Sequence, residues 1–231
     1  MKIKDLAFIT AILAFAAVFI FIPPVTDWYL HFNKEHGMVM SFIKFAVLST
    51  LGEVIALRIG TGNYYETGYG ILPRMIVWGI LGLGINLAFT IFAAGAPAFL
   101  AYIGFTDAPQ AMNEGFSGFK LFVAFTISAT MNLIFAPVMM TFHEITDIHI
   151  TDTGGTVKGL FTRIPFVAIL NKTDWDVMWN FVLKRMIPYF WIPAHTITFL
   201  LPVEFRILFA AFLGIALGLI LATGSLKSRK S

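Results

Sequence analysis

Polar side chains stand near the middle of several long apolar runs in this sequence. Asn86, Asn132 and His195 each lie close to the centre of such a run, and Thr198 follows three positions after His195. A polar group costs free energy in hydrocarbon, so it normally faces the interior of a helix bundle or a water-filled cavity. Their shared depth predicts a polar path that binds or passes a small solute. The alternative is that these groups only form hydrogen bonds between helices and fix the packing.

Two pairs of charged residues are expected to act together. Glu53 lies near the end of one apolar run and Arg74 at the start of the next, where adjacent antiparallel helices would bring them into an ion pair. Such a pair would lock the two helices together or gate passage between them. Glu204 and Arg206 follow Pro202 within another apolar run, where each charge needs water or the other charge as its partner.

The segment 143–152 contains side chains that could bind a metal ion. His143 and Asp147 are four residues apart, so they would share one face of a helix, and His149 follows them. This spacing matches no known zinc signature, so we predict no metal, no cofactor and no catalytic residue. Phosphate-binding loops, dinucleotide fingerprints and nucleophile elbows are also absent, and familiar enzyme classes find no support. An intramembrane metalloenzyme that uses the cluster from His143 to Asp152, which also contains Glu144, remains as an alternative.

The segments that carry these groups indicate an all-helical membrane protein. Hydrophobic residues make up 58% of the 231 residues and charged residues 13%, which is more apolar surface than a soluble chain of this length buries. A helix of about 20 apolar residues crosses a bilayer core of roughly 30 Å. We predict a polytopic transmembrane helix bundle of five to six segments, forming a single domain over residues 1–231. The apolar runs are continuous, as helices require, and occupy residues 5–23, 38–57, 75–97, 119–141 and 187–223.

The last run is too long for one crossing, because its 37 residues would form a helix of about 55 Å. Pro202 is the natural break, and the run then forms two short helices that cross twice or make a re-entrant pair. Residues 142–186 are predicted to be a cytoplasmic loop. Within it, Thr173 and Asp176 resemble a capping box that begins an amphipathic helix lying at the membrane interface.

Cations are distributed unevenly among the predicted loops, and this indicates an orientation. With six crossings, one side receives only Lys34, Lys120 and Arg206. We therefore predict that both termini are cytoplasmic. The net charge of +3 is what cytoplasmic loop cations produce, so no nucleic-acid partner is predicted. The other side collects Lys2, Lys4, Arg58, Arg74, Lys158, Arg163, Lys172, Lys184, Arg185, Lys227, Arg229 and Lys230.

Lipid is one expected partner of this chain, and a second copy of the chain is another. Ala210, Gly214 and Gly218 form a ladder of small residues spaced by four positions. Such a ladder predicts a close helix contact, either within one chain or in a homo-oligomer.

Several short motifs follow one another in order over residues 48–210. They are Gly52 and Glu53, Arg74 to Gly79, Gly84, Asn132 to Val138 with Pro137, and Trp191, Pro193, Ala194, Phe199, Pro202, Phe205 and Arg206. This pattern resembles the Mpv17/PMP22 family of small membrane proteins. The sequence departs from the family pattern at Leu57, Ile85 and Thr198, where the family has glutamine, proline and asparagine.

This resemblance implies a polytopic protein of bacterial or organelle inner membranes, with the first helix as an amino-terminal addition. Members of the family are described as channel-like pores whose physiological substrate is unsettled. It also implies that the break at Pro202 is a family feature, with Arg206 capping or pairing at the junction of two helices. We therefore predict a channel or pore for small solutes. A scaffold or assembly subunit that does not transport is the alternative.

Overall fold

In the computed structural model, residues 3–228 are described, apart from the side chains of residues 16, 20, 217 and 219–228. This part of the chain contains helices and no strands, as the composition predicted. Lys2, Arg229 and Lys230, which contributed to the predicted orientation, lie outside the described residues. The elements are α1 (Ile3–Phe21), α2 (Pro23–Glu35), α3 (Gly37–Thr61), α4 (Ile71–Tyr102), α5 (Ala108–Ala111), α6 (Gly118–Asp152), α7 (Val157–Leu160), α8 (Phe166–Lys172), α9 (Trp175–Val177), η1 (Met178–Trp191), α10 (Ile192–Leu200) and α11 (Val203–Ser228).

Three of these helices are long and apolar enough to cross a membrane. They are α3, α4 and α6, which contain the predicted runs 38–57, 75–97 and 119–141. α1 and α2 meet the same criterion only as a pair, with a bend of 80° between them. The predicted five to six segments are therefore not confirmed in the described part of the chain.

The chain divides into two compact units, residues 1–40 and residues 41–231. The first unit holds α1 and α2, and aromatic rings join them: the rings of Phe19 and Tyr29 meet edge to face, with centroids 5.7 Å apart. The second unit holds all of the candidate site residues. The buried apolar clusters and the cavity described below all consist of residues of the second unit.

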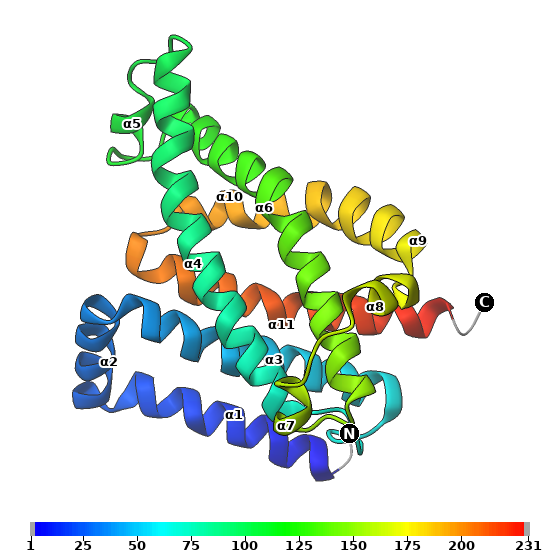
Figure 1. The fold of residues 1–231 in the computed structure, drawn as a ribbon. Helices are drawn as coiled ribbons and strands as arrows, with labels where there is room; N and C mark the ends of the chain where they lie inside the picture. The colour runs from blue at the N-terminus through cyan, green and yellow to red at the C-terminus, as the bar shows by residue number, and fades with distance from the viewer. Residues whose placement is uncertain (1–2, 229–231) are drawn as a thin grey trace. The chain divides into compact units, whose positions relative to one another are not determined.

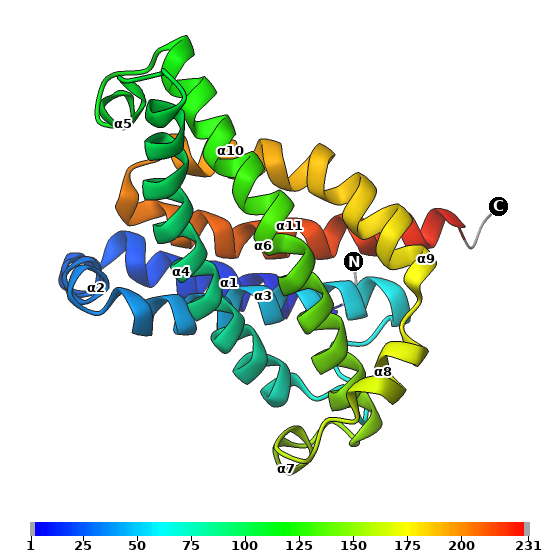
Figure 2. The same cartoon turned by 45° about the horizontal axis from the view of Figure 1, so that its top comes forward.

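The second unit is built on α4 and α6, which pack along each other (Figure 1). η1 and α10 continue one another as one helical rod, and α10 packs against α6. α11 returns beside this rod, as the turned view also shows (Figure 2). The centre of the apolar core lies where α3, α4, α6 and α10 meet. It includes the buried side chains of Phe45, Phe89, Ile127 and Phe199.

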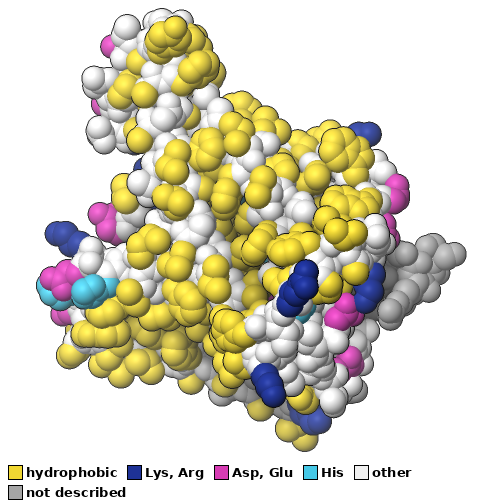
Figure 3. Space-filling model, in the orientation of Figure 1, with side chains coloured by type: hydrophobic (Ala, Val, Ile, Leu, Met, Phe, Trp, Pro, Cys, Tyr) yellow, Lys and Arg dark blue, Asp and Glu magenta, His cyan; other side chains and the backbone are white. Residues whose placement is uncertain are grey.

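The outer surface of α4 and α6 is apolar. In the space-filling view, hydrophobic side chains cover most of the visible face of these two helices, whereas charged side chains gather near α7, α8 and α9 (Figure 3). On α6 the exposed apolar residues include Leu133, Ile134 and Val138, each more than 60% exposed. An exposed apolar face on a long helix is what contact with lipid requires.

The predicted break at Pro202 is confirmed, and it separates α10 from α11. The predicted pair of short helices is wrong, because α10 continues directly from η1 and α11 has 26 residues. Arg206 caps the end of α10: its Nε donates to the Leu201 carbonyl oxygen at 3.0 Å, and its Nη2 to the Phe199 carbonyl oxygen at 3.0 Å. Glu204 is exposed and forms no ion pair with Arg206. The guanidinium thus donates hydrogen bonds to carbonyl groups that have no partner at the C-terminus of a helix.

The predicted loop over residues 142–186 is wrong at both of its ends. α6 continues to Asp152, because the polar residues after 141 find partners on neighbouring elements. The predicted interfacial helix is capped by Asp174, whose carboxylate accepts from the Val177 amide at 3.0 Å, whereas Thr173 donates to the Ile169 carbonyl. This helix does not end at 186 but runs on into η1 and α10.

The ladder of small residues on α11 makes its close contact within the chain. A methyl group added at Gly218 would lie 2.6 Å from the carbonyl oxygen of Gly52, and one added at Gly52 would lie 2.8 Å from that of Gly214. Only glycine allows two helix backbones to approach this closely. Gly52 therefore packs α3 against α11. The close helix contact predicted for the ladder is thus made within one chain.

Candidate solute site

A cluster of charged and aromatic side chains joins α3, α4 and α6. The ion pair predicted between Glu53 and Arg74 is present, with Arg74 Nη1 3.1 Å from Glu53 Oε2. The other carboxylate oxygen of Glu53 accepts from Trp78 Nε1 at 2.8 Å and from His143 Nε2 at 3.0 Å. Arg74 also forms an ion pair with Asp147. Arg74 is thus the counter-ion of both carboxylates, so each of the three charges has an ion-pair partner within the protein.

Tyr69 lies in the connection between α3 and α4 and extends this cluster. Arg74 Nε donates to the Tyr69 carbonyl oxygen at 2.9 Å, and the guanidinium carbon lies 4.4 Å from the centre of the phenol ring. Burial raises the pKa of the Tyr69 hydroxyl, and the negative charge of Glu53 raises this pKa further. Tyr69 therefore stays neutral and covers one side of Arg74.

The metal site considered from the sequence is not assembled with the residues that suggested it. His149 turns away from His143 and Asp147, since its Nε2 bonds the Gly159 carbonyl oxygen at 3.1 Å. Glu53 takes its place, and one ligand atom from each of Glu53, His143 and Asp147 lies within 4.8 Å of the others. Arg74 already binds both carboxylates, however, and a metal ion would have to displace its positive charge. The cluster therefore fits an arginine better than a metal ion.

A second polar group joins α6 to α10. Asn132 and His195 are buried and in contact, with Asn132 Nδ2 3.0 Å from His195 Nδ1. Asn132 Nδ2 also donates to the Ser128 carbonyl oxygen at 2.8 Å, which fixes the amide. The His195 ring stacks on that of Trp191, with centroids 5.2 Å apart.

The other two residues of the predicted polar path lie elsewhere. Asn86 donates to the Ser41 hydroxyl at 2.7 Å, and Thr198 donates to the Ala194 carbonyl oxygen of its own helix at 2.9 Å. Neither residue lines the cavity described below. The shared depth of the four residues in the sequence gave no information on the direction of each side chain, and only Asn132 and His195 are brought together.

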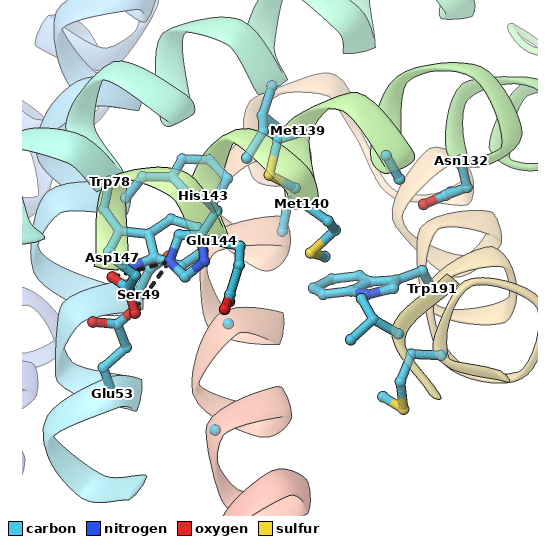
Figure 4. Close-up of a pocket in the computed structure, with 18 of the residues that line it drawn as sticks. Ser49, Glu53, Trp78, Asn132, Met139, Met140, His143, Glu144, Asp147 and Trp191 are labelled. Atoms are coloured by element: carbon cyan, nitrogen blue, oxygen red, sulfur yellow. Dashed lines mark hydrogen bonds and ion pairs between the residues drawn. The ribbon is translucent and has the colours of Figure 1, made fainter. Parts of the chain in front are cut away.

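Both polar groups border one cavity of about 410 Å³, and all of its lining residues belong to the unit 41–231. Figure 4 shows Glu53, His143 and Asp147 at one side and Asn132 and Trp191 at the other. Methionine and aromatic side chains form most of the wall between them. These are Phe45, Phe89, Phe135, Phe181, Met131, Met139, Met140, Met178 and Met186.

The π-helical geometry of η1 places the residues that it contributes to the cavity wall on one face. Met178, Val182, Met186 and Trp191 all line the cavity, although they are spaced by four, four and five residues. In an α-helix this spacing would carry the side chains progressively around the helix. η1 is a π-helix, whose wider turn of i to i+5 hydrogen bonds keeps residues at these spacings on one face.

Three polar groups of the cavity wall have no partner in the described part of the protein. Ser49 Oγ and Trp191 Nε1 are buried and make no hydrogen bond. Glu144 is half-buried, and its carboxylate forms neither a hydrogen bond nor an ion pair. In Figure 4 it lies between the charged cluster and Trp191. Groups of this kind are costly to bury unless a ligand or water provides the missing partner.

Sequence reasoning missed Trp78 as a residue of the site, and it gave Trp191 only as a position of the family resemblance and Glu144 only as a member of the possible metal cluster. Trp78 lies four residues after Arg74 and one helical turn along α4, which was a usable signal. Glu144 follows His143 directly and would be expected on a different face of a regular helix. No sequence signal predicts that both faces border the same cavity.

Comparison of the chain with protein-family models, with curated proteins and with solved structures finds no match.

Proposed function

We propose that this protein is a membrane-embedded channel or carrier that binds a small solute in the cavity between α3, α4, α6, η1, α10 and α11 and passes it across the membrane. The cavity itself is the observation that supports this proposal, because three of the helices that form it are long and apolar enough to span a bilayer. Transport proteins hold their solutes in cavities among membrane-spanning helices, where a few polar groups face the solute.

The size and walls of the cavity suit a small organic solute. Its volume of about 410 Å³ is within the range of roughly 300–1,000 Å³ found for ligand pockets. Such pockets are largely apolar, with a few polar groups that orient the ligand, as this cavity is. The methionines in its wall, including Met139 and Met140, are flexible side chains that adapt to ligands of different shape.

The groups without partners favour a solute site over the scaffold alternative. If the polar residues served only to hold helices together, their hydrogen bonds would be satisfied by one another, as those of Asn132 and His195 are. Ser49 and Trp191 are buried in the same wall with no such bond. A solute or water that enters the cavity would supply it.

The membrane and orientation belong to the same proposal. The cation distribution and the resemblance of residues 48–210 to the Mpv17/PMP22 family support an inner membrane of a bacterium, archaeon or organelle, with both termini in the cytoplasm.

Filling the cavity is expected to stop solute flux. Met140 extends into the cavity (Figure 4), so Met140→Trp would narrow it with a bulkier and more rigid side chain, whereas Val138 is 68% exposed on the outer face of the same helix. The purified protein would be reconstituted in liposomes, and their swelling followed in iso-osmotic solutions of small neutral, anionic and cationic organic solutes. Wild type and Val138→Trp should pass at least one solute class, and Met140→Trp should pass none.

Either of two results would contradict the proposal. A folded wild-type protein that passes no solute of the panel would favour the scaffold alternative. Equal flux through Met140→Trp and wild type would show that solutes take another route. Circular dichroism and size-exclusion profiles of each variant would establish that it is folded.

A further inference from the structure

The cavity wall carries more negative than positive charge. Glu53, Glu144 and Asp147 are its carboxylates, and Arg74 is its one guanidinium among the described residues. A proton on His143 would add one positive charge and still leave the cavity with a net charge of −1. His195 contacts an amide and two aromatic rings but no carboxylate, so nothing in its surroundings favours a second proton.

This surplus is concentrated on Glu144. Arg74 is shared by Glu53 and Asp147, and Glu53 receives two further hydrogen bonds, from Trp78 and His143. Glu144 has none of these partners, and it faces the cavity between the charged cluster and Trp191 (Figure 4). A half-buried carboxylate that no counter-ion or hydrogen-bond donor contacts is stabilised by a positive charge or a proton beside it. A cationic group on the ligand would satisfy it.

The walls select an organic cation over a metal ion. A divalent ion such as Ca²⁺ or Mg²⁺ needs about six oxygen ligands. Among the described residues, Glu144 is the one carboxylate of the cavity wall that has no partner, so it supplies too few of them. The remaining wall consists mostly of apolar side chains, including the rings of Phe181 and Trp191. Aromatic faces attract ammonium groups and bind the hydrocarbon attached to them.

A second feature of the ligand follows from Trp191, which is 8% exposed and has an indole N–H without an acceptor. The indole can only donate, so the ligand must present an oxygen there. Ser49 is 1% exposed, and its hydroxyl is a further group that can donate or accept. The indole N–H of Trp191 and the hydroxyl of Ser49 are thus two further groups, besides the Glu144 carboxylate, that a ligand could bind.

We propose that the solute is a small organic cation, a primary or quaternary ammonium compound that also carries a hydroxyl or carbonyl oxygen. Its ammonium group pairs with Glu144, and its oxygen accepts from Trp191. This inference rests on the proposed function, since it names the class of solute that the same cavity holds.

The test compares binding of matched probes to the purified protein in lipid nanodiscs. Choline and ethanolamine carry an ammonium and a hydroxyl group, dimethylbutanol is the uncharged isostere of choline, and butyrate is an anion of similar size. Isothermal titration calorimetry should show both cations binding more tightly than dimethylbutanol and butyrate. Glu144→Gln should weaken binding of the cations about thirtyfold or more and leave that of dimethylbutanol unchanged. Glu114→Gln, which alters an exposed glutamate outside the cavity, is the matched control and should bind as wild type does.

The remaining outcomes separate this inference from the proposed function. Preference for butyrate or dimethylbutanol, or cation binding that Glu144→Gln leaves intact, would overturn the organic cation while keeping a solute site. If none of the probes binds and the liposomes pass no solute of any charge, both proposals fail.

Discussion

Replacing Arg74 by methionine is expected to lower the free energy of unfolding by about 3–5 kcal/mol. The side chain of Arg74 is 7% exposed, and its guanidinium is the counter-ion of both Glu53 and Asp147. Methionine has a similar length but no charge, so two carboxylates would be left close together in a poorly hydrated place. Unfolding in mixed micelles by titration with sodium dodecyl sulfate, followed by tryptophan fluorescence, measures the change.

A triple variant separates the charge of Arg74 from its packing. Removing a whole buried ion cluster costs much less than removing one member of it. Arg74→Met combined with Glu53→Gln and Asp147→Asn should therefore recover most of the stability that the single variant loses. If the triple variant were as unstable as Arg74→Met, or if the single variant lost less than about 1 kcal/mol, the cluster would not be a buried ion pair network.

The second large effect is expected where α3 crosses α11. A methyl group at Gly52 would lie 2.8 Å from the Gly214 carbonyl oxygen and 2.9 Å from Ile215 Cα, so backbone would have to move away from backbone. Overpacking of this kind costs about 1–3 kcal/mol. Gly52→Ala should therefore lower the thermal midpoint in detergent, and it should also reduce solute flux, since both helices contribute to the cavity.

Gly95→Ala is the matched control for this contact. Gly95 lies inside α4 with nothing within 4 Å of an added methyl group. Alanine in place of glycine in a helix interior stabilises by roughly 0.5–1 kcal/mol, so this variant should unfold at the same temperature as wild type or a higher one. Equal behaviour of the two variants would show that α3 and α11 do not meet closely at Gly52.

Much of this arrangement could be predicted from residue types and spacing. The long apolar runs predicted α3, α4 and α6, and the order of Glu53 and Arg74 predicted their ion pair. The spacing of His143 and Asp147 correctly indicated a shared helical face. What the sequence could not show is that these two pairs form one cluster, because their contact depends on the packing of three helices.

The rest of the site depends on features that leave no periodic pattern. Asn86 and Thr198 have the same depth as Asn132 and His195 but point to other partners, and depth alone does not fix rotation about a helix axis. The face that η1 presents to the cavity follows from π-helical winding, whereas sequence periodicity assumes an α-helix.

The central claim is that a solvent-accessible cavity lies inside the membrane-spanning bundle, and cysteine labelling tests it directly. The sequence contains no cysteine, so single substitutions can be placed without removing native thiols. Met140→Cys would put a thiol in the cavity, and Val138→Cys would put one on the outer face of the same helix. A thiol reacts as its thiolate, which forms in water and not in hydrocarbon.

The measurement is the rate at which each variant in liposomes reacts with a positively charged, membrane-impermeant methanethiosulfonate reagent. We expect Met140→Cys to react readily and Val138→Cys to stay unmodified, with both reacting after the protein is unfolded in detergent. A thiol at 140 that reacts no faster than the one at 138 would contradict the account, because the cavity would then be closed to water and to solutes.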